Sequence, residues 1–167
     1  MPVAERVIRT VISLARLGAG LAFALLIASV LIQVVGRLSG ASPVWTEELT
    51  RFALLYMVAF GAGLAFRSGD LVNVDVVCEA LPGALPWLLR LLAAVGTAGL
   101  ALWLLPQAWR YVAIGQMQTA PALGVRMDFV HFSVWLMLAG LALFGTLRIV
   151  GMLTDAEDGT PEKSDGG

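Results

Sequence analysis

Residues 42–66 read SPVWTEELTRFALLYMVAFGAGLAF and join a charged cluster directly to an apolar run. After Arg51 the next charged residue is Arg67. An α-helix needs roughly 20 apolar residues to cross the bilayer core, which is about 30 Å thick. The run 52–66 is shorter than that, so a spanning helix must include turns on either side of it. This places part of the charged cluster in or near the headgroup layer.

The composition places the whole chain in the membrane class. Hydrophobic residues make up 59% of the sequence and charged residues only 14%, and the mean hydropathy is +0.85. These values lie far outside those of an ordinary soluble domain. The 11 basic and 12 acidic residues nearly balance, so the sequence lacks the basic face that nucleic-acid binding requires.

Cysteine and histidine are too rare to build a disulfide framework or a metal centre. The sequence has one cysteine, Cys78, and one histidine, His131, so an intramolecular disulfide and a thiolate or imidazole cluster are both excluded. We interpret Cys78 as a small apolar side chain. No cofactor and no metal are expected.

The spaces between charges predict an all-α integral membrane protein with four transmembrane helices. Besides 52–66, long apolar runs occupy 17–36, 91–109 and 129–147. We predict one four-helix membrane domain over residues 1–153, followed by a disordered acidic cytoplasmic tail over 154–167. The predicted spans are about 14–37, 44–67, 86–109 and 128–150.

The N-terminal apolar run is predicted to be a retained anchor, because it is longer than the core of a cleaved signal peptide and Arg37 follows it. The distribution of Lys and Arg then favours a cytoplasmic location for both termini. In this orientation seven basic residues face the cytoplasm and four face the other side. The first group is Arg6, Arg9, Arg16, Arg67, Arg90, Arg148 and Lys163, and the second is Arg37, Arg51, Arg110 and Arg126.

The charged cluster has the features of a helix start. Ser42 suits the N-cap and Pro43 the first helical position, so a helix is expected to begin near Pro43. Glu47 and Glu48 would then lie near the positive end of the helix dipole, at spacings of four and three residues from Arg51. The three side chains can form one solvated ion-pair network. The alternative is that one of these charges faces a partner helix, because an uncompensated charge in lipid costs several kcal/mol.

A second polar segment, 66–86, follows the same apolar run and contains Arg67, Gly69 and Asp75. Its alternating pattern predicts a short amphipathic segment at the cytoplasmic face, or else an ordinary surface connector. Small residues at helical spacing are candidates for close helix packing. They are Gly20, Ala24 and Ala28 in the first span, and Gly61, Ala62 and Ala65 in the second. Pro106 is expected to kink the third span or mark its last turn.

The order and spacing of these elements resemble the small membrane subunit, the Q-type or DctQ-like subunit, of tripartite ATP-independent periplasmic (TRAP) transporters. The resemblance covers nearly the whole chain and includes QTAPALGV at 118–125, just before the last helix. Its central part runs from a W-x-E-E-x-x-R pattern to a Leu-Pro pair. The matching positions are Trp45, Glu47, Glu48, Arg51, Gly61, Ala62, Arg67, Gly69, Val72, Val74, Asp75, Leu81 and Pro82.

The resemblance implies a non-enzymatic subunit of a secondary transporter in the bacterial inner membrane. In this family a large M-type membrane subunit carries the substrate with Na⁺, and a periplasmic substrate-binding protein delivers an organic anion such as a carboxylate. The small subunit braces the large one. We therefore expect Trp45, Glu47, Glu48, Arg51, Arg67 and Asp75 to contact the large subunit or lipid headgroups.

Two other classes of protein remain as alternatives. One is a stand-alone small four-helix transporter or channel. The other is a redox or quinone-linked membrane subunit, although His131 alone cannot provide the two histidines of a bis-histidine haem. The substrate cannot be chosen from this sequence.

Overall fold

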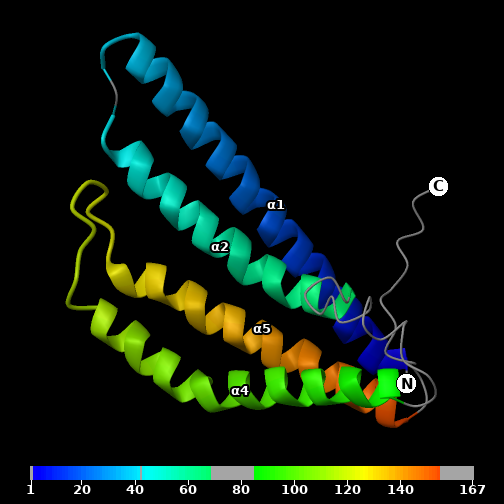
Figure 1. Ribbon diagram of the computed structural model, residues 1–167. Coiled ribbons are helices and arrows are strands. Elements are labelled where there is room, and N and C mark those ends of the chain that lie inside the picture. The colour runs from blue at the N-terminus through cyan, green and yellow to red at the C-terminus, as the bar shows by residue number, and fades with distance from the viewer. Residues whose placement is uncertain (1, 42, 69–84, 155–167) are drawn as a thin grey trace, which may run out of the picture. The chain divides into compact units, whose positions relative to one another are not determined.

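A computed structural model describes residues 2–41, 43–68 and 85–154 of the chain (Figure 1). The described residues form four α-helices: α1 (Pro2–Leu38), α2 (Trp45–Ser68), α4 (Leu85–Gly115) and α5 (Met127–Leu153). Each helix is long and apolar enough to cross a membrane, and in α1 the qualifying part is Ile8–Leu38. The predicted four-span, all-α membrane architecture is therefore confirmed. The predicted amphipathic segment falls largely in 69–84 and the predicted tail in 155–167, which lie outside the described residues.

Two helices extend well beyond the spans predicted from the charges. Helix α1 begins at Pro2, where a proline at the first helical position is favourable, and no further Pro or Gly interrupts it before Gly18. Helix α4 continues through Pro106 and Arg110 to Gly115, so Pro106 does not mark a last turn. The exposed side chain of Arg110 can extend toward water while its helix stays in the apolar layer.

The start of α2 lies slightly later than predicted. The helix begins at Trp45, because the residues before it form a tighter turn in which Thr46 N–H donates to the Pro43 carbonyl at 3.3 Å. Glu47 N–H donates in the same way to the Val44 carbonyl, also at 3.3 Å. Such i to i−3 bonds are common at helix ends. Ser42, the predicted N-cap, lies outside the described residues.

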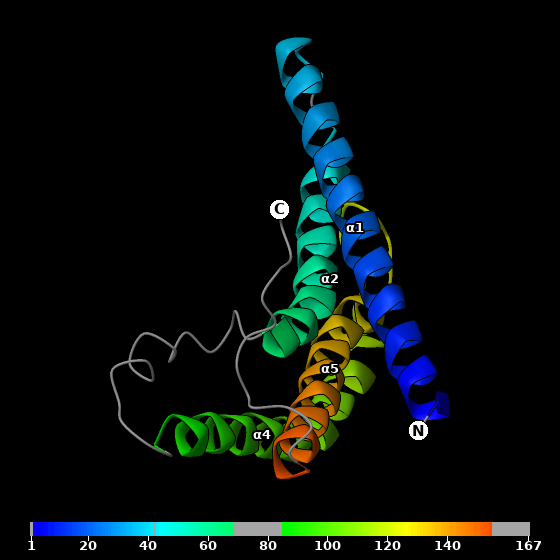
Figure 2. The same ribbon diagram turned by 90° about the vertical axis from the view of Figure 1, so that its right-hand side faces the viewer.

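The chain divides into two compact units. The first contains Met1–Gly61 and Pro106–Met137. Within it, α1 lies beside the first part of α2 (Figures 1 and 2), and the two helices meet where Gly18 faces the ring of Phe60. A Cβ atom on Gly18 would lie 2.8 Å from that ring, so a larger residue would require the Phe60 ring to move.

The second unit contains Ala62–Leu105 and Leu138–Gly167. Here the backbones of α2 and α5 come together at two glycines, because a Cβ on Gly140 would lie only 3.8 Å from the Gly63 Cα. Helix α4 meets α5 where Gly145 faces Ala98, and a Cβ on Gly145 would lie 2.9 Å from the Ala98 Cβ. Small residues thus permit the closest helix contacts, as expected where lipid offers no hydrophobic drive for association.

The buried apolar residues are mostly alanines, whereas most of the large apolar side chains point outward. The buried alanines of the described chain are Ala22, Ala53, Ala59, Ala94, Ala98, Ala101, Ala108, Ala120 and Ala142. The burial also differs between helices, since 33% of the most apolar window of α5 is buried but only 11% of that of α1. Helix α5 is therefore the one most surrounded by protein, and α1 the one most open.

Gly115, the last residue of α4, provides a stability test of close packing. We expect Gly115→Ala to destabilise the chain by about 1–3 kcal/mol, because its Cβ would lie 2.6 Å from both the Asp128 backbone nitrogen and His131 Nδ1. Gly99→Ala in the same helix is the matched control. Nothing lies within 4 Å of a Cβ at Gly99, so the better helix propensity of alanine should stabilise the chain by up to about 1 kcal/mol. Thermal unfolding in detergent measures both variants, and equal shifts would contradict the packing shown here.

Candidate functional site

The charged cluster at the start of α2 separates into an outward pair and an inward carboxylate. Arg51 Nη2 lies 2.7 Å from Glu47 Oε1, and both side chains are largely exposed to solvent (69% and 58%). This i, i+4 pair is well placed near the positive end of the helix dipole. An exposed ion pair of this kind stabilises the chain by only about 0.3–0.5 kcal/mol. Glu47 and Arg51 can therefore pair with charges on another surface at little cost in stability.

Glu48 does not join that pair, so the single network that the sequence allowed is not formed. Its carboxylate instead accepts hydrogen bonds from the backbone of the α4–α5 loop. Ala122 N–H donates to both carboxylate oxygens at 3.2 Å, and Leu123 N–H donates to Oε2 at 3.0 Å. Hydrogen bonds to an ionised carboxylate are stronger than neutral ones. Glu48 therefore ties the loop to the first turn of α2.

The loop itself, residues 116–126, is a compact turn with its own hydrogen bonds. Ala120 N–H donates to the Val125 carbonyl at 2.8 Å, and Gly124 N–H donates to the Ala120 carbonyl at 2.9 Å. Gly124 has a φ of 67°, a left-handed conformation that glycine adopts without strain. An isolated antiparallel bridge between Thr119 and Arg126 closes the loop before α5 begins.

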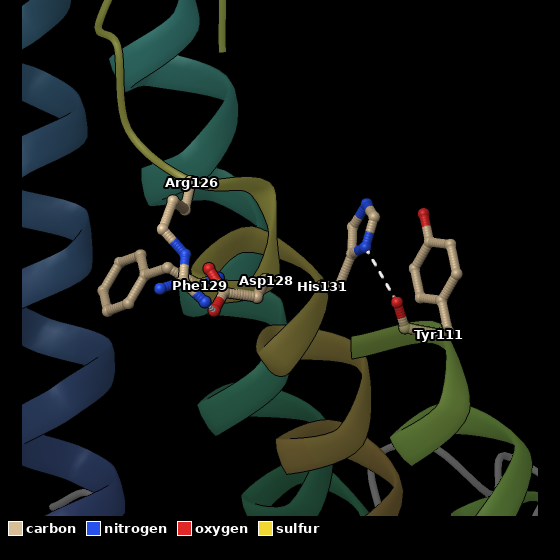
Figure 3. A network of polar contacts seen from close by, with 5 residues as sticks. All are labelled: Tyr111, Arg126, Asp128, Phe129 and His131. Carbon is tan, nitrogen blue, oxygen red and sulfur yellow. Dashed lines mark hydrogen bonds and ion pairs between the residues drawn. The ribbon is translucent and has the colours of Figure 1, made fainter. Parts of the chain in front are cut away.

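The first turn of α5 carries a second polar group, shown in Figure 3. Arg126 Nη2 donates to Asp128 Oδ2, and the other oxygen of Asp128 accepts the Phe129 N–H at 2.9 Å. A carboxylate in the first turn compensates the free N–H groups and the positive dipole end of the helix. The hydroxyl of Tyr56 on α2 donates to the Phe129 carbonyl at 2.6 Å, which joins α2 to the same turn.

His131 joins the end of α4 to the start of α5. Its Nδ1 lies 3.1 Å from the Tyr111 carbonyl oxygen, and its ring stacks on the Tyr111 ring with 3.8 Å between centroids (Figure 3). The side chain of His131 is buried. No sequence pattern indicated Tyr111 as the partner of this histidine.

The other predicted docking residues do not gather at this end of the chain. Trp45 is exposed at the first position of α2, two residues before Glu47 in the sequence. Arg67 lies in the last turn of α2 and belongs to the second unit, so it stands at the opposite end of the helix from Trp45. Asp75 lies outside the described residues. A role for Arg67 with Asp75 stays a prediction.

The residues predicted to pack helices are mostly open within the described chain. Nothing lies within 4 Å of a Cβ built on Gly20 or on Gly61, and Ala24 is exposed. Ala62 and Ala65 are half-buried. The close contacts of these two helices are instead made by the neighbouring glycines named above. A packing role for the open residues stays a prediction and would concern another chain.

Arg148 is a structural residue that the sequence analysis used only as a charge for orientation. It is buried in the second unit, and its Nη1 donates to the Phe66 carbonyl in the last turn of α2 at 3.1 Å. The guanidinium carbon also lies 5.8 Å from the centre of the Phe66 ring, in the range of a cation–π contact. Its position inside the predicted span 128–150, with apolar residues on both sides, was the available signal, because a charge there requires a partner.

Four membrane-length helices that pack through small residues define the class: this is a multi-pass α-helical membrane protein. A family model described as "Tripartite ATP-independent periplasmic transporters, DctQ component" matches residues 26–155. Because the match covers most of the chain, the protein belongs to the DctQ family of TRAP transporter components. A comparison with curated proteins gives no match.

The role of Arg148 predicts a loss of stability on truncation. Arg148→Met keeps much of the side-chain volume but leaves the Phe66 carbonyl without this donor, so we expect destabilisation by about 1–3 kcal/mol. Arg110→Met removes an exposed arginine of α4 and should shift the stability by no more than about 0.5 kcal/mol. Thermal unfolding in one detergent compares the variants. A loss of stability in Arg110→Met as large as in Arg148→Met would argue against a specific cap.

Proposed function

We propose that this chain is the scaffold that holds the large M-type subunit of a TRAP transporter during Na⁺-coupled uptake of an organic anion. In this proposal a periplasmic substrate-binding protein delivers a carboxylate substrate, and the complex resides in the bacterial inner membrane. Both termini are cytoplasmic, so the 116–126 loop faces the periplasm. Membership of the DctQ family is the observation that carries this proposal.

The state of the polar side chains supports a scaffold rather than a pore. Within the described ranges, every buried side-chain nitrogen or oxygen already has a hydrogen-bond partner. Ser29 donates to the Leu25 carbonyl at 2.8 Å, and Ser133 donates to the Val130 carbonyl at 2.7 Å. A substrate or Na⁺ site at the bilayer midplane typically uses broken helices and free polar groups. In the described part of the chain, the buried polar side chains are instead hydrogen-bonded within the protein.

The Glu47–Arg51 pair, with Trp45 beside it, is the proposed contact with the large subunit or with lipid headgroups. Its exposure and its small intrinsic stability make exchange with a partner charge inexpensive. Arg67 and Asp75 are proposed to act in the same way near the other end of α2. The open face of α1, which includes Gly20 and Ala24, is proposed to allow close approach of a helix of the large subunit.

A charge swap tests whether Glu47 and Arg51 contact a partner protein or only each other. Arg51→Glu should reduce co-purification of the large subunit at least about fivefold. The double variant Glu47→Arg with Arg51→Glu restores the local pair with reversed polarity and is the matched comparison. If the pair contacts fixed charges of a partner, the double variant stays defective. Full recovery in the double variant, or normal assembly in both variants, would show that the pair is only a local ion pair.

Reconstitution tests the division of labour between subunits. In liposomes with a Na⁺ gradient, this chain with the large subunit and the binding protein should take up a labelled carboxylate, and omission of this chain should abolish uptake. The chain reconstituted alone should give no flux above that of empty liposomes. Flux through the chain alone would refute the scaffold role and support the stand-alone transporter.

A further inference from the structure

Two adjacent glutamates at the start of α2 have different partners, although the sequence gives them equivalent positions near Arg51. Glu47 is exposed and pairs with Arg51 on its own helix. Glu48 is half-buried and binds the backbone of a loop more than 70 positions further along the chain, at Ala122 and Leu123. The contact of Glu48 is therefore tertiary, whereas that of Glu47 is local.

The Glu48 carboxylate supplies what the loop cannot supply for itself. Within the described parts of the chain, neither Ala122 nor Leu123 donates to a backbone carbonyl, whereas other N–H groups of the loop do, those of Gln116, Met117, Gln118, Ala120 and Gly124. Their two successive N–H groups both point to Glu48. The Ala122 bonds are exposed and the Leu123 bond is partly buried, so the charged acceptor chiefly fixes the conformation of the loop. Occupation of both oxygens by the loop also leaves Glu48 poorly placed to contact another chain.

Residues 116–125 of the loop carry no charge and present a partly apolar surface. The candidate spans end at Gly115 and resume at Met127, so residues 116–126 lie outside the stretches that hydrocarbon would cover. Yet Met117 is 85% exposed, and no charged residue occurs between Arg110 and Arg126. Residues 116–125 lack the exposed Lys and Arg that lipid headgroups attract, and Arg126 at the end of the loop is already paired with Asp128. A protein surface of low charge is the partner that fits it.

We propose that Glu48 is a positioning residue that presets the 116–126 loop for a surface of low charge on the large subunit, without itself contacting that subunit. This inference rests on the proposed function, in which the chain assembles with other components. It assigns different roles to the two glutamates. Glu47 belongs to a contact surface, and Glu48 holds the 116–126 loop, which forms a second contact surface.

Hydrogen exchange of the full-length chain in detergent measures the positioning directly. In Glu48→Ala the amides of Ala122 and Leu123 should exchange at least tenfold faster than in the wild type. Glu48→Gln keeps an acceptor oxygen but loses the charge, so its exchange rates should fall between the two. Glu47→Ala is the control for these two amides and should leave their exchange unchanged. Unchanged exchange in Glu48→Ala would overturn the proposal.

A double-mutant cycle on assembly tests whether Glu48 acts through the loop. Ala122→Pro removes one of the two donors from the loop side while Glu48 stays intact. We expect Glu48→Ala and Ala122→Pro each to reduce recovery of the large subunit, and the double variant to be no worse than the more defective single variant. Additive losses would mean that Glu48 contacts the partner itself and would overturn the proposal. So would normal recovery in Glu48→Ala despite faster exchange.

A missing contact between Glu48 and the loop and a wrong proposed function give different experimental results. The exchange rates are measured on this chain whatever its cargo, so they test the contact between Glu48 and the loop alone. The proposed function fails instead if the wild-type chain neither recovers the large subunit nor supports uptake.

Discussion

The structure depends on the close approach of its helices, although burying apolar surface between helices contributes little to stability inside a bilayer. In a bilayer the surroundings are as apolar as a leucine side chain, so association depends on van der Waals contact and hydrogen bonds between helices. Here the contact is made possible by Gly63 and Gly140 in one unit and by Gly18 and Gly115 in the other. The polar links follow from the same proximity. His131 can reach the Tyr111 carbonyl because Gly115 lets the ends of α4 and α5 meet.

Hydropathy and charge spacing were sufficient to predict the four helices, because the requirement for about 20 apolar residues is a property of the bilayer. They were less reliable for helix ends. Arg110 was taken as a boundary, but a long cationic side chain at the surface of a helix can reach water while the helix continues to Gly115. Pro43 suggested a helix start, but a tighter turn delays α2 to Trp45.

Side-chain partners were harder to predict because they depend on tertiary contacts. Helical spacing places both glutamates within reach of Arg51, and only the position of the 116–126 loop separates their roles. Likewise, Gly18 and Gly20 lie in the same glycine-rich stretch of α1, and spacing alone does not reveal which of them faces Phe60. Arg148 carried a usable signal, since a charge within an apolar run requires a partner, but its acceptor on α2 could not be named from sequence.

Because the interior is rich in alanine, the size of the residues inside and outside this chain is the reverse of that in a water-soluble domain, and so is the kind of substitution that each position tolerates. In a water-soluble domain the large apolar side chains fill the core and the surface varies freely. In this chain the outward positions hold the large residues, and lipid accepts Leu, Ile, Val or Phe there with little preference. The buried positions, such as Ala94 and Ala101, admit almost nothing larger than a methyl group without separating two helices. Over evolution, drift should therefore exchange bulky residues for one another on the outside, while the small residues inside preserve the shape.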